Sequence, residues 1–244
     1  MIRTFYITYI LLLFGISIAI LFPIIFILSL FRARKLIFHI MRYWTKWWLF
    51  MIGMSPTVIG NIPDGKYIYV ANHISYLDSM VLFATIPGYF CPLGNKEFST
   101  KPIIGLIYKQ ITILVDRGSA ESRAKSVKTL QNIINKGTSI CIFPEGKFNE
   151  TDKTLLDFYD GAFRLAINTQ TPILPVVLPD TVHRWHWNSW FSQTPGKNRA
   201  IFLDPIDVSN LRMVEDLEAL KYKAHSVIKS RLDNDNNYTH RRLS

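Results

Sequence analysis

Hydrophobic positions are unevenly distributed, and the longest uncharged stretch lies at the start of the chain. From Phe5 to Phe31, 27 consecutive residues include no Asp, Glu, Lys or Arg. A helix of that length measures ~40 Å, whereas the hydrocarbon core of a bilayer is ~30 Å thick. Pro23 interrupts the run, so a kinked or tilted span and a helical hairpin that enters and returns both fit the pattern. The run ends in Arg32-Ala-Arg-Lys35 rather than at a small-residue cleavage site, which favours a retained membrane anchor over a signal peptide.

The next segment, 36–54, mixes aromatic, aliphatic and basic residues. Trp44, Trp47 and Trp48 interleave with Arg42 and Lys46. This mixture is typical of an amphipathic helix that lies at the level of the lipid headgroups, and a core helix of the globular domain is the alternative. We therefore assign residues 1–55 to a membrane anchor followed by an interfacial helix.

After residue 56 the pattern changes to short β-rich runs that alternate with helical ones. The predicted strands are 66–71, 89–93, 112–115, 139–143, 173–178 and 200–203. The predicted helices are one that begins near residue 75, followed by 102–109, 119–136, 161–169 and 214–231. This alternation predicts an α/β domain over residues 56–232, with a largely parallel central sheet flanked by helices on both faces. The polar segment 233–244 is expected to be a frayed tail.

The charge balance indicates an anionic partner. The formal net charge is +10, but the sequence contains no zinc-ligand spacing, no aromatic RNA-binding signature and no basic recognition helix. Nucleic acid is therefore not expected as a partner, and a hydrophobic anchor followed by basic residues favours a lipid surface. Arg32, Arg34 and Lys35 follow the uncharged run, whereas Arg3 alone precedes it. This bias predicts an inner or cytoplasmic membrane protein whose domain faces the cytoplasm.

The stretch from Asn72 to Asp78 carries the clearest candidate chemistry. His73 comes at the end of a predicted strand, where α/β sheets place their sites. On one continuous helix His73 and Asp78 would point ~140° apart, but a strand-to-helix turn, with Ser75 capping the helix, removes that conflict. A carboxylate that accepts from one imidazole nitrogen leaves the other nitrogen as a base for a hydroxyl. A purely structural capping box formed by Ser75 and Asp78 is the alternative.

Three further blocks follow in order: 96–105 (Lys-Glu-Phe-Ser-Thr-Lys-Pro-Ile-Ile-Gly) before Asp116-Arg117, 143–146 (Phe-Pro-Glu-Gly) and 171–176 (Thr-Pro-Ile-Leu-Pro-Val). With the Asn-His-x4-Asp block, this set resembles the lysophosphatidic acid acyltransferases of the glycerolipid acyltransferase superfamily. The resemblance runs from about residue 66 to residue 177.

The resemblance implies that His73 is the base and that Asp78 orients it, with direct attack of an acceptor hydroxyl on an acyl thioester. It implies that Arg117 binds the acceptor phosphate and that Glu145 and Gly146 shape the acceptor site. The same blocks supply the remaining candidate substrate-binding residues, which are Asn72, Ser75, Lys96 and Lys147.

The expected reaction moves an acyl group from acyl-CoA or acyl carrier protein, as co-substrate, to 1-acyl-glycerol-3-phosphate, and gives phosphatidic acid. Membrane lipids are the other expected partners, and no cofactor is expected. The Phe-Pro-Glu-Gly block is usually followed by Thr-Arg-Ser, but here by Lys147-Phe148-Asn149, and the Gly expected before Arg117 is absent. Another lysolipid acceptor therefore stays open, as does a lipid-binding protein without turnover.

A tryptophan-rich segment, 184–191, follows the last of these blocks. His183 and His186 are three residues apart, but no carboxylate or Cys ligand is nearby, so no metal site is expected. Dense tryptophan beside Arg184 and Lys197 favours a segment that rests on the membrane interface.

Overall fold

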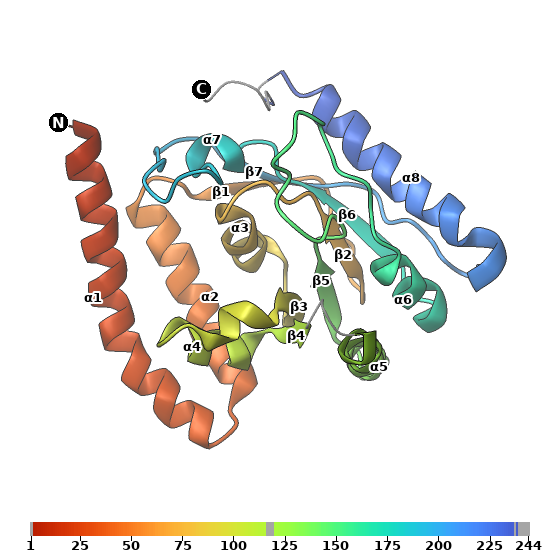
Figure 1. The fold of residues 1–244 in the computed structure, drawn as a ribbon, viewed down its shortest axis with the longest axis horizontal. Helices are drawn as coiled ribbons and strands as arrows, with labels where there is room; N and C mark the ends of the chain where they lie inside the picture. Colours follow the sequence, from red (N-terminus) through yellow and green to blue (C-terminus); the bar gives the residue numbers. More distant parts are fainter. Residues whose placement is uncertain (1, 116–119, 237, 239–244) are drawn as a thin grey trace.

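A parallel sheet forms the centre of the domain. The computed structural model describes residues 2–115, 120–236 and 238. In this part of the chain the sheet has seven strands in the order β1-β7-β6-β2-β5-β3-β4, and every pair is parallel except β6 with β7 (Figure 1). The strands are β1 (Pro56–Ile59), β2 (Ile68–Ala71), β3 (Phe90–Asn95), β4 (Ile113–Val115), β5 (Ser139–Ile142), β6 (Ile173–Val177) and β7 (Asn198–Phe202).

The central strands are buried on both faces. In β2, Ile68 and Val70 pack into one hydrophobic cluster, while Tyr69 and Ala71 pack into the other. Because successive side chains of a strand point to opposite faces, a strand covered on both sides needs apolar residues at every position. This is why the predicted strands appear in the sequence as continuous apolar runs rather than as alternating ones.

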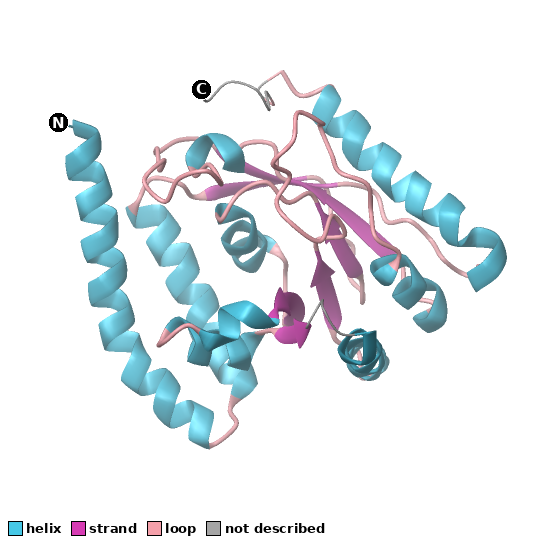
Figure 2. Cartoon of the chain, in the orientation of Figure 1, coloured by secondary structure: helices cyan, strands magenta, loops and turns pink. Residues whose placement is uncertain are grey.

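Helices cover both faces, as the alternation predicts (Figure 2). One hydrophobic cluster joins the sheet to α5 (Ala120–Asn135), α6 (Gly161–Thr169) and α8 (Met213–Asp233). The other joins the opposite face to α1 (Ile2–Leu30), α2 (Arg34–Met51), α3 (Leu77–Thr85) and α4 (Ile104–Ile111). The short helix α7 (Thr181–Arg184) contacts α3 and β7.

The first two helices form a hairpin. α1 continues through Pro23, and a short turn reverses the chain into α2 (Figure 1). Tyr6 Oη donates to the carbonyl of Ile52, and Trp44 Nε1 donates to Ser17 Oγ, so the two helices are joined along their length. The uncharged run is therefore one continuous helix, and the returning arm of the hairpin is the tryptophan-rich α2. Within the described residues α1 is the one helix long and apolar enough to cross a membrane, with a mean hydropathy of 3.0.

The sequence pattern missed β1, α7 and a 3-10 turn, η1 (Lys96–Thr100). The expectation of a frayed tail from residue 233 is wrong for the residues that the structure describes. Asp235 is buried, and Tyr238 donates a hydrogen bond to the carbonyl of Thr154 at 2.9 Å. Long-range polar contacts hold this segment, and such contacts leave no periodic pattern in the local sequence.

Candidate active site

His73 lies two residues beyond the end of β2, at the middle of the sheet. Its strand is flanked by β5 and β6, and both run parallel to it. The carboxyl ends of these three strands therefore meet at one edge, and the chain that leaves each of them can reach His73. Open α/β sheets bind their ligands at this edge.

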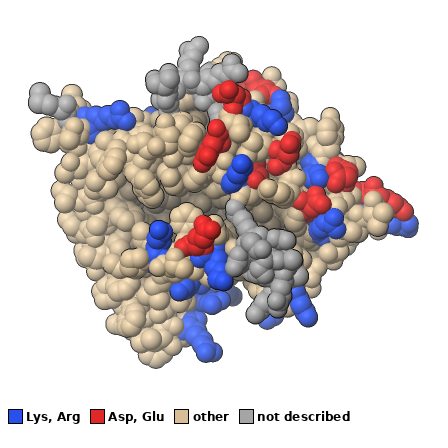
Figure 3. Space-filling view, in the orientation of Figure 1, with Lys and Arg blue, Asp and Glu red and all other residues tan. Residues whose placement is uncertain are grey.

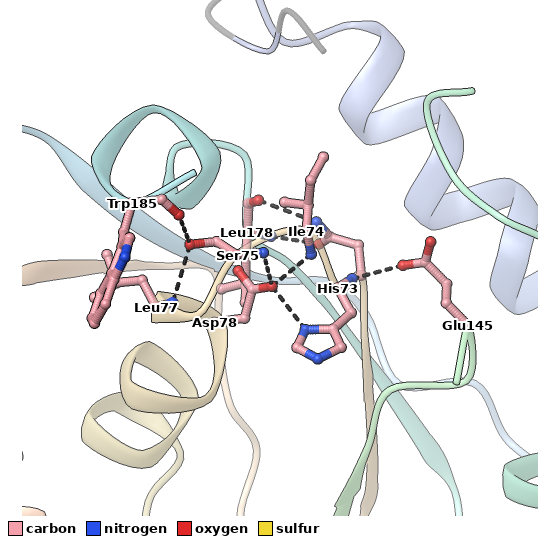
Figure 4. Close-up of polar contacts among 9 residues, drawn as sticks. His73, Ile74, Ser75, Leu77, Asp78, Glu145, Leu178 and Trp185 are labelled. Carbon is pink, nitrogen blue, oxygen red and sulfur yellow. Dashed lines mark hydrogen bonds and ion pairs between the residues drawn. The ribbon is translucent and has the colours of Figure 1, made fainter. Parts of the chain in front are cut away.

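A carboxylate orients the imidazole. His73 Nδ1 lies 2.9 Å from Asp78 Oδ2, and Asp78 is fully buried. The same oxygen accepts the backbone N–H groups of Ile74 at 2.6 Å and Ser75 at 2.8 Å (Figure 4). Three donors thus fix this oxygen, and a proton on Nδ1 leaves Nε2, on the far side of the ring, as the basic nitrogen.

The capping arrangement and the catalytic arrangement share these contacts. Ser75 Oγ accepts the N–H of Leu77 at 3.0 Å, and the Asp78 carboxylate accepts the N–H of Ser75. This resembles a capping box, except that the hydroxyl accepts the N–H of Leu77 and not that of Asp78. The start of α3 therefore fixes the carboxylate that orients His73, so the two interpretations of the sequence are compatible.

Aromatic rings hold the imidazole from the side. The His73 ring stacks on Phe143 with 3.9 Å between centroids and lies 4.4 Å from the ring of Phe148. The His73 side chain remains 17 % exposed. The ring is thus restrained without being sealed in the core.

The chain after β5 holds the backbone of His73. Glu145 Oε1 accepts the N–H of His73 at 2.6 Å, and the N–H of Asn149 donates to the carbonyl of His73 at 2.8 Å. Glu145 Oε2 accepts the N–H of Leu156 at 3.0 Å. Glu145 is 2 % exposed, and burial raises its pKa to about 8, although the two backbone hydrogen bonds oppose that rise.

The chain after β6 holds the residue before the histidine. Asn72 Oδ1 accepts the N–H of Leu178 at 2.8 Å, and Asn72 Nδ2 donates to the carbonyl of Leu178 at 3.2 Å. Ser75 Oγ donates to the carbonyl of Trp185, just beyond α7. The side chains of Asn72 and Ser75 are both buried. They fasten the turn that carries His73, residues 72–78, to the chain after β6.

The described residues line two apolar cavities, and both cavities reach the ring of Phe143, which stacks on the imidazole of His73. The larger has a volume of about 600 Å³ and lies between β5, α5 and α6, and the smaller has about 200 Å³ and lies between α2, α3 and α4. Phe143 and Leu93 line both cavities. Because Phe143 stacks on His73, both spaces reach a residue that contacts the candidate base.

A sequence model of the family described as Acyltransferase matches residues 55–179, which are just over half of the chain and include His73, Asp78 and Glu145. The chain belongs to the acyltransferase family. It is 31% identical over 174 residues to the 1-acyl-sn-glycerol-3-phosphate acyltransferase of Haemophilus influenzae, and the alignment covers 68% of each protein.

Other relatives carry the same name. The ovine 1-acyl-sn-glycerol-3-phosphate acyltransferase alpha (Ovis aries) is 29% identical over 171 residues, which are 68% of this chain and 58% of the relative. The Cocos nucifera enzyme is 30% identical over 144 residues, which are 58% of this chain and 46% of the relative. The chain thus spans about half to two thirds of the length of these relatives.

A crystal structure shares the fold across almost the whole acyltransferase. The 1-acyl-sn-glycerophosphate (LPA) acyltransferase PlsC from Thermotoga maritima superposes with a TM-score of 0.76 and 95% coverage of both chains, at 20% sequence identity. The match includes the N-terminal hairpin, because 95% coverage leaves no room to omit both helices.

The expected substrate-binding residues of this acyltransferase fall into separate groups. Gly146 and Lys147 line the larger cavity, and Gly146 has a φ of +72°. Lys96 is exposed at the start of η1, after β3. Arg117 lies outside the described residues, although Val115, two positions earlier, lines the larger cavity. Asn72, Ser75 and Glu145 bond to backbone groups of the turn that carries His73 and of the chain segments after β5 and β6.

Some contacts at the site were not expected from the sequence. Phe143 and Phe148 hold the imidazole, and the backbone of Asn149 supports it. Phe143 opens a block that the resemblance identified, but nothing in its local pattern indicates a stacked ring. Among the described residues, no group of three or more His, Cys, Asp and Glu side chains comes together as a metal site would require.

Proposed function

We propose that this acyltransferase transfers a fatty acyl group from the thioester of acyl-CoA or acyl carrier protein to the sn-2 hydroxyl of 1-acyl-glycerol-3-phosphate, which yields phosphatidic acid. The observation that carries the proposal is the imidazole of His73, held by Asp78 through Nδ1 with Nε2 on the opposite side of the ring. The names of the relatives support the choice of acceptor.

The reaction follows from that geometry. His73 Nε2 takes the proton of the acceptor hydroxyl, and the oxygen attacks the thioester carbonyl. The new C–O ester bond forms as the C–S bond breaks, and the leaving thiolate takes the proton from the imidazolium. Asp78 stabilises the imidazolium between these steps because its buried carboxylate stays within hydrogen-bond distance of Nδ1. No acyl-enzyme is formed.

The substrates are proposed to occupy the two apolar spaces and their charged rim. Acyl chains suit these cavities because the lining is mostly aliphatic and aromatic. Lys147 at the rim of the larger cavity and Arg117 are proposed to bind the acceptor phosphate, an anion that a planar guanidinium binds well. Lys96, which is exposed at the same edge of the sheet, is proposed to meet the acidic acyl carrier.

The helical hairpin is proposed to hold the enzyme at the membrane, with the catalytic domain on the cytoplasmic side. Large apolar side chains of α1 and α2 are exposed, among them Ile20, Phe26, Trp47 and Phe50. Figure 3 shows a largely uncharged surface over α1, whereas charged side chains gather over α6 and α8. An apolar surface of this kind is favourable in lipid and unfavourable in water. Arg32, Arg34 and Lys35, in and after the hairpin turn, are suited to anionic headgroups.

One assay tests the proposal and separates it from its rivals. Full-length protein in vesicles is given labelled acyl-CoA or acyl carrier protein with lysophosphatidate or with other lysolipids, and His73→Ala is measured beside it. Lysophosphatidate turnover that His73→Ala abolishes supports the proposal. Turnover with other lysolipids alone changes the acceptor, and vesicle binding without turnover in the unmodified chain contradicts enzymatic activity. Arg117→Ala is expected to raise KM for phosphate-bearing acceptors.

A further inference from the structure

The loop after β5 travels far from the sheet before it returns to α6. Residues 147–158, here called the 147–158 loop, form no helix or strand, and their course brings them beside the C-terminal end of α8 (Figure 1). The near part of this loop contacts His73 through Phe148 and Asn149, and its far part donates the Leu156 N–H to Glu145. The loop is therefore linked to His73 both directly and through Glu145.

A short turn at the C-terminal end of α8 holds the far part of the loop. Tyr238 Oη donates to the carbonyl of Thr154 at 2.9 Å, and Thr154 Oγ1 donates to Asp233 Oδ1 at 2.7 Å. The N–H of Tyr238 donates to the carbonyl of Asp235, which closes the turn. Burial and the nearby carboxylates of Glu145 and Asp78 raise the pKa of Tyr238, so its phenol stays a donor at neutral pH.

The same turn is fastened to the sheet by a buried ion network. Arg199 on β7 donates to both oxygens of Asp235, at 2.8 and 3.0 Å, and to both oxygens of Asp180. The side chains of Arg199, Asp180 and Asp235 are each at most 7% exposed. Asp180 lies two residues after Leu178, the partner of Asn72. The turn that contains Asp235 and Tyr238 thus reaches two chain segments, the loop after β5 and the connection after β6. Both segments support the active-site turn, residues 72–78.

We propose that Asp235 and Tyr238 are positioning residues for the acyl transfer: they fasten the 147–158 loop and the β6–α7 connection around His73. This rests on the proposed function, in which His73 is the base. The chain of contacts runs from Tyr238 to Thr154, then through Leu156 to Glu145 and the backbone of His73. A displacement of the base by even a fraction of an ångström lowers the rate because proton transfer requires close alignment.

A purely structural role makes a different prediction. If the turn only stabilised the fold, loss of its hydrogen bonds would lower the melting temperature and leave the kinetics of the folded enzyme unchanged. A positioning role lowers kcat in molecules that remain folded. It leaves KM nearly unchanged because Thr154, Arg199 and Asp180, the residues through which the turn acts, line neither cavity.

The test compares Tyr238→Phe and Asp235→Asn with a matched control, Thr171→Val, in the full-length protein. Thr171 is fully buried and its hydroxyl also bonds to a neighbour, but it lies just before β6, at the opposite edge of the sheet from His73. Tyr238→Phe and Thr171→Val should each lower Tm by about 2–4 °C, since each removes a buried hydroxyl that donates to a backbone carbonyl. Tyr238→Phe and Asp235→Asn are expected to lower kcat on the order of 10-fold with KM within about two-fold, whereas Thr171→Val is expected to keep kcat.

Hydrogen exchange gives a second measurement that needs no turnover. The amides of His73, Asn149 and Leu156 should exchange faster in Tyr238→Phe than in the unmodified chain, and at an unchanged rate in Thr171→Val. Unchanged exchange, or an equal loss of kcat in the control, would overturn the positioning role. Absence of acyl transfer in the unmodified chain would instead count against the proposed function, while the exchange measurement still tests the turn.

Discussion

Replacing Asp78 by asparagine tests the arrangement around His73 most directly. Asp78 Oδ2 accepts three hydrogen bonds, from His73 Nδ1 and from the N–H groups of Ile74 and Ser75. The other oxygen, Oδ1, is buried and has no hydrogen-bond partner among the described residues. An amide oxygen can take the position of Oδ2, which places the new NH2 group where Oδ1 was.

The magnitude follows from these contacts. Each hydrogen bond to the charged carboxylate contributes about 1.5–3 kcal/mol, and its neutral counterpart about 0.5–1.5 kcal/mol. Three such changes amount to roughly 3 kcal/mol, and a buried NH2 without a partner adds about 1–3 kcal/mol. Asp78→Asn is therefore expected to reduce the free energy of unfolding by about 4–6 kcal/mol. The imidazolium of His73 also loses its counter-charge, which predicts a kcat lower by about 10³–10⁴-fold.

Both quantities are measured on one preparation. Thermal unfolding in detergent gives the stability, and acyl transfer at saturating substrate, at a temperature where the variant is folded, gives kcat. Asp157→Asn is the matched control because Asp157 lies on the 147–158 loop and its side chain is 94% exposed. This variant should change neither the free energy of unfolding nor kcat. A folded Asp78→Asn enzyme that keeps kcat within about ten-fold of the unmodified enzyme would refute the role of Asp78 as the partner of the base.

Three further changes test the surroundings. The pKa of Glu145 is raised from 4.5 to about 8, so the free energy of unfolding should fall by on the order of 4–5 kcal/mol as pH rises from about 4.5 to about 8. Denaturation measured at several pH values should show this fall in the unmodified chain and not in Glu145→Gln. Gly146→Ala places a Cβ 2.8 Å from the Tyr159 ring at a φ of +72°, and should lower stability by about 1–3 kcal/mol; Tyr159→Ala added to it should restore only part. Arg42→Met leaves two carbonyls at the end of α3 without their donor. It should reduce the free energy of unfolding by about 2–4 kcal/mol and so lower Tm. An unchanged Tm would show that these two hydrogen bonds do not stabilise the fold.

The sheet and the pair at its centre were accessible from the sequence because both depend on local signals. Parallel strands covered on both faces are continuous apolar runs, and six of the strands in the described part of the chain were found that way. The pair of His73 and Asp78 follows from a strand end next to a capping box. β1 was missed because it has four residues and an exposed pattern, so it lacks that apolar signal.

The rest depends on contacts between distant segments. Glu145 was expected to shape the acceptor site, but its carboxylate turns inward to two backbone N–H groups. An identical local sequence would allow either direction. The tail after residue 233 is polar, and Arg199, 36 residues away from Asp235 along the chain, holds Asp235 among the described residues of this tail. No periodicity of the tail itself carries that information.

Lys147, Phe148 and Asn149, which stand where Thr-Arg-Ser is usual after the Phe-Pro-Glu-Gly block, have different physical roles. Where Thr-Arg-Ser is usual, Asn149 supports His73 through a backbone N–H, which every residue except proline supplies. The ring of Phe148 adds contact area to the imidazole. The support of the base is therefore independent of the missing side chains. What changes is the cation: Phe148 stands where the Arg is usual, and Lys147, one position earlier, lines the cavity rim with a single ammonium group and not with a two-pronged guanidinium. Any difference in acceptor preference between this enzyme and its relatives is consequently expected at that rim and not at the base.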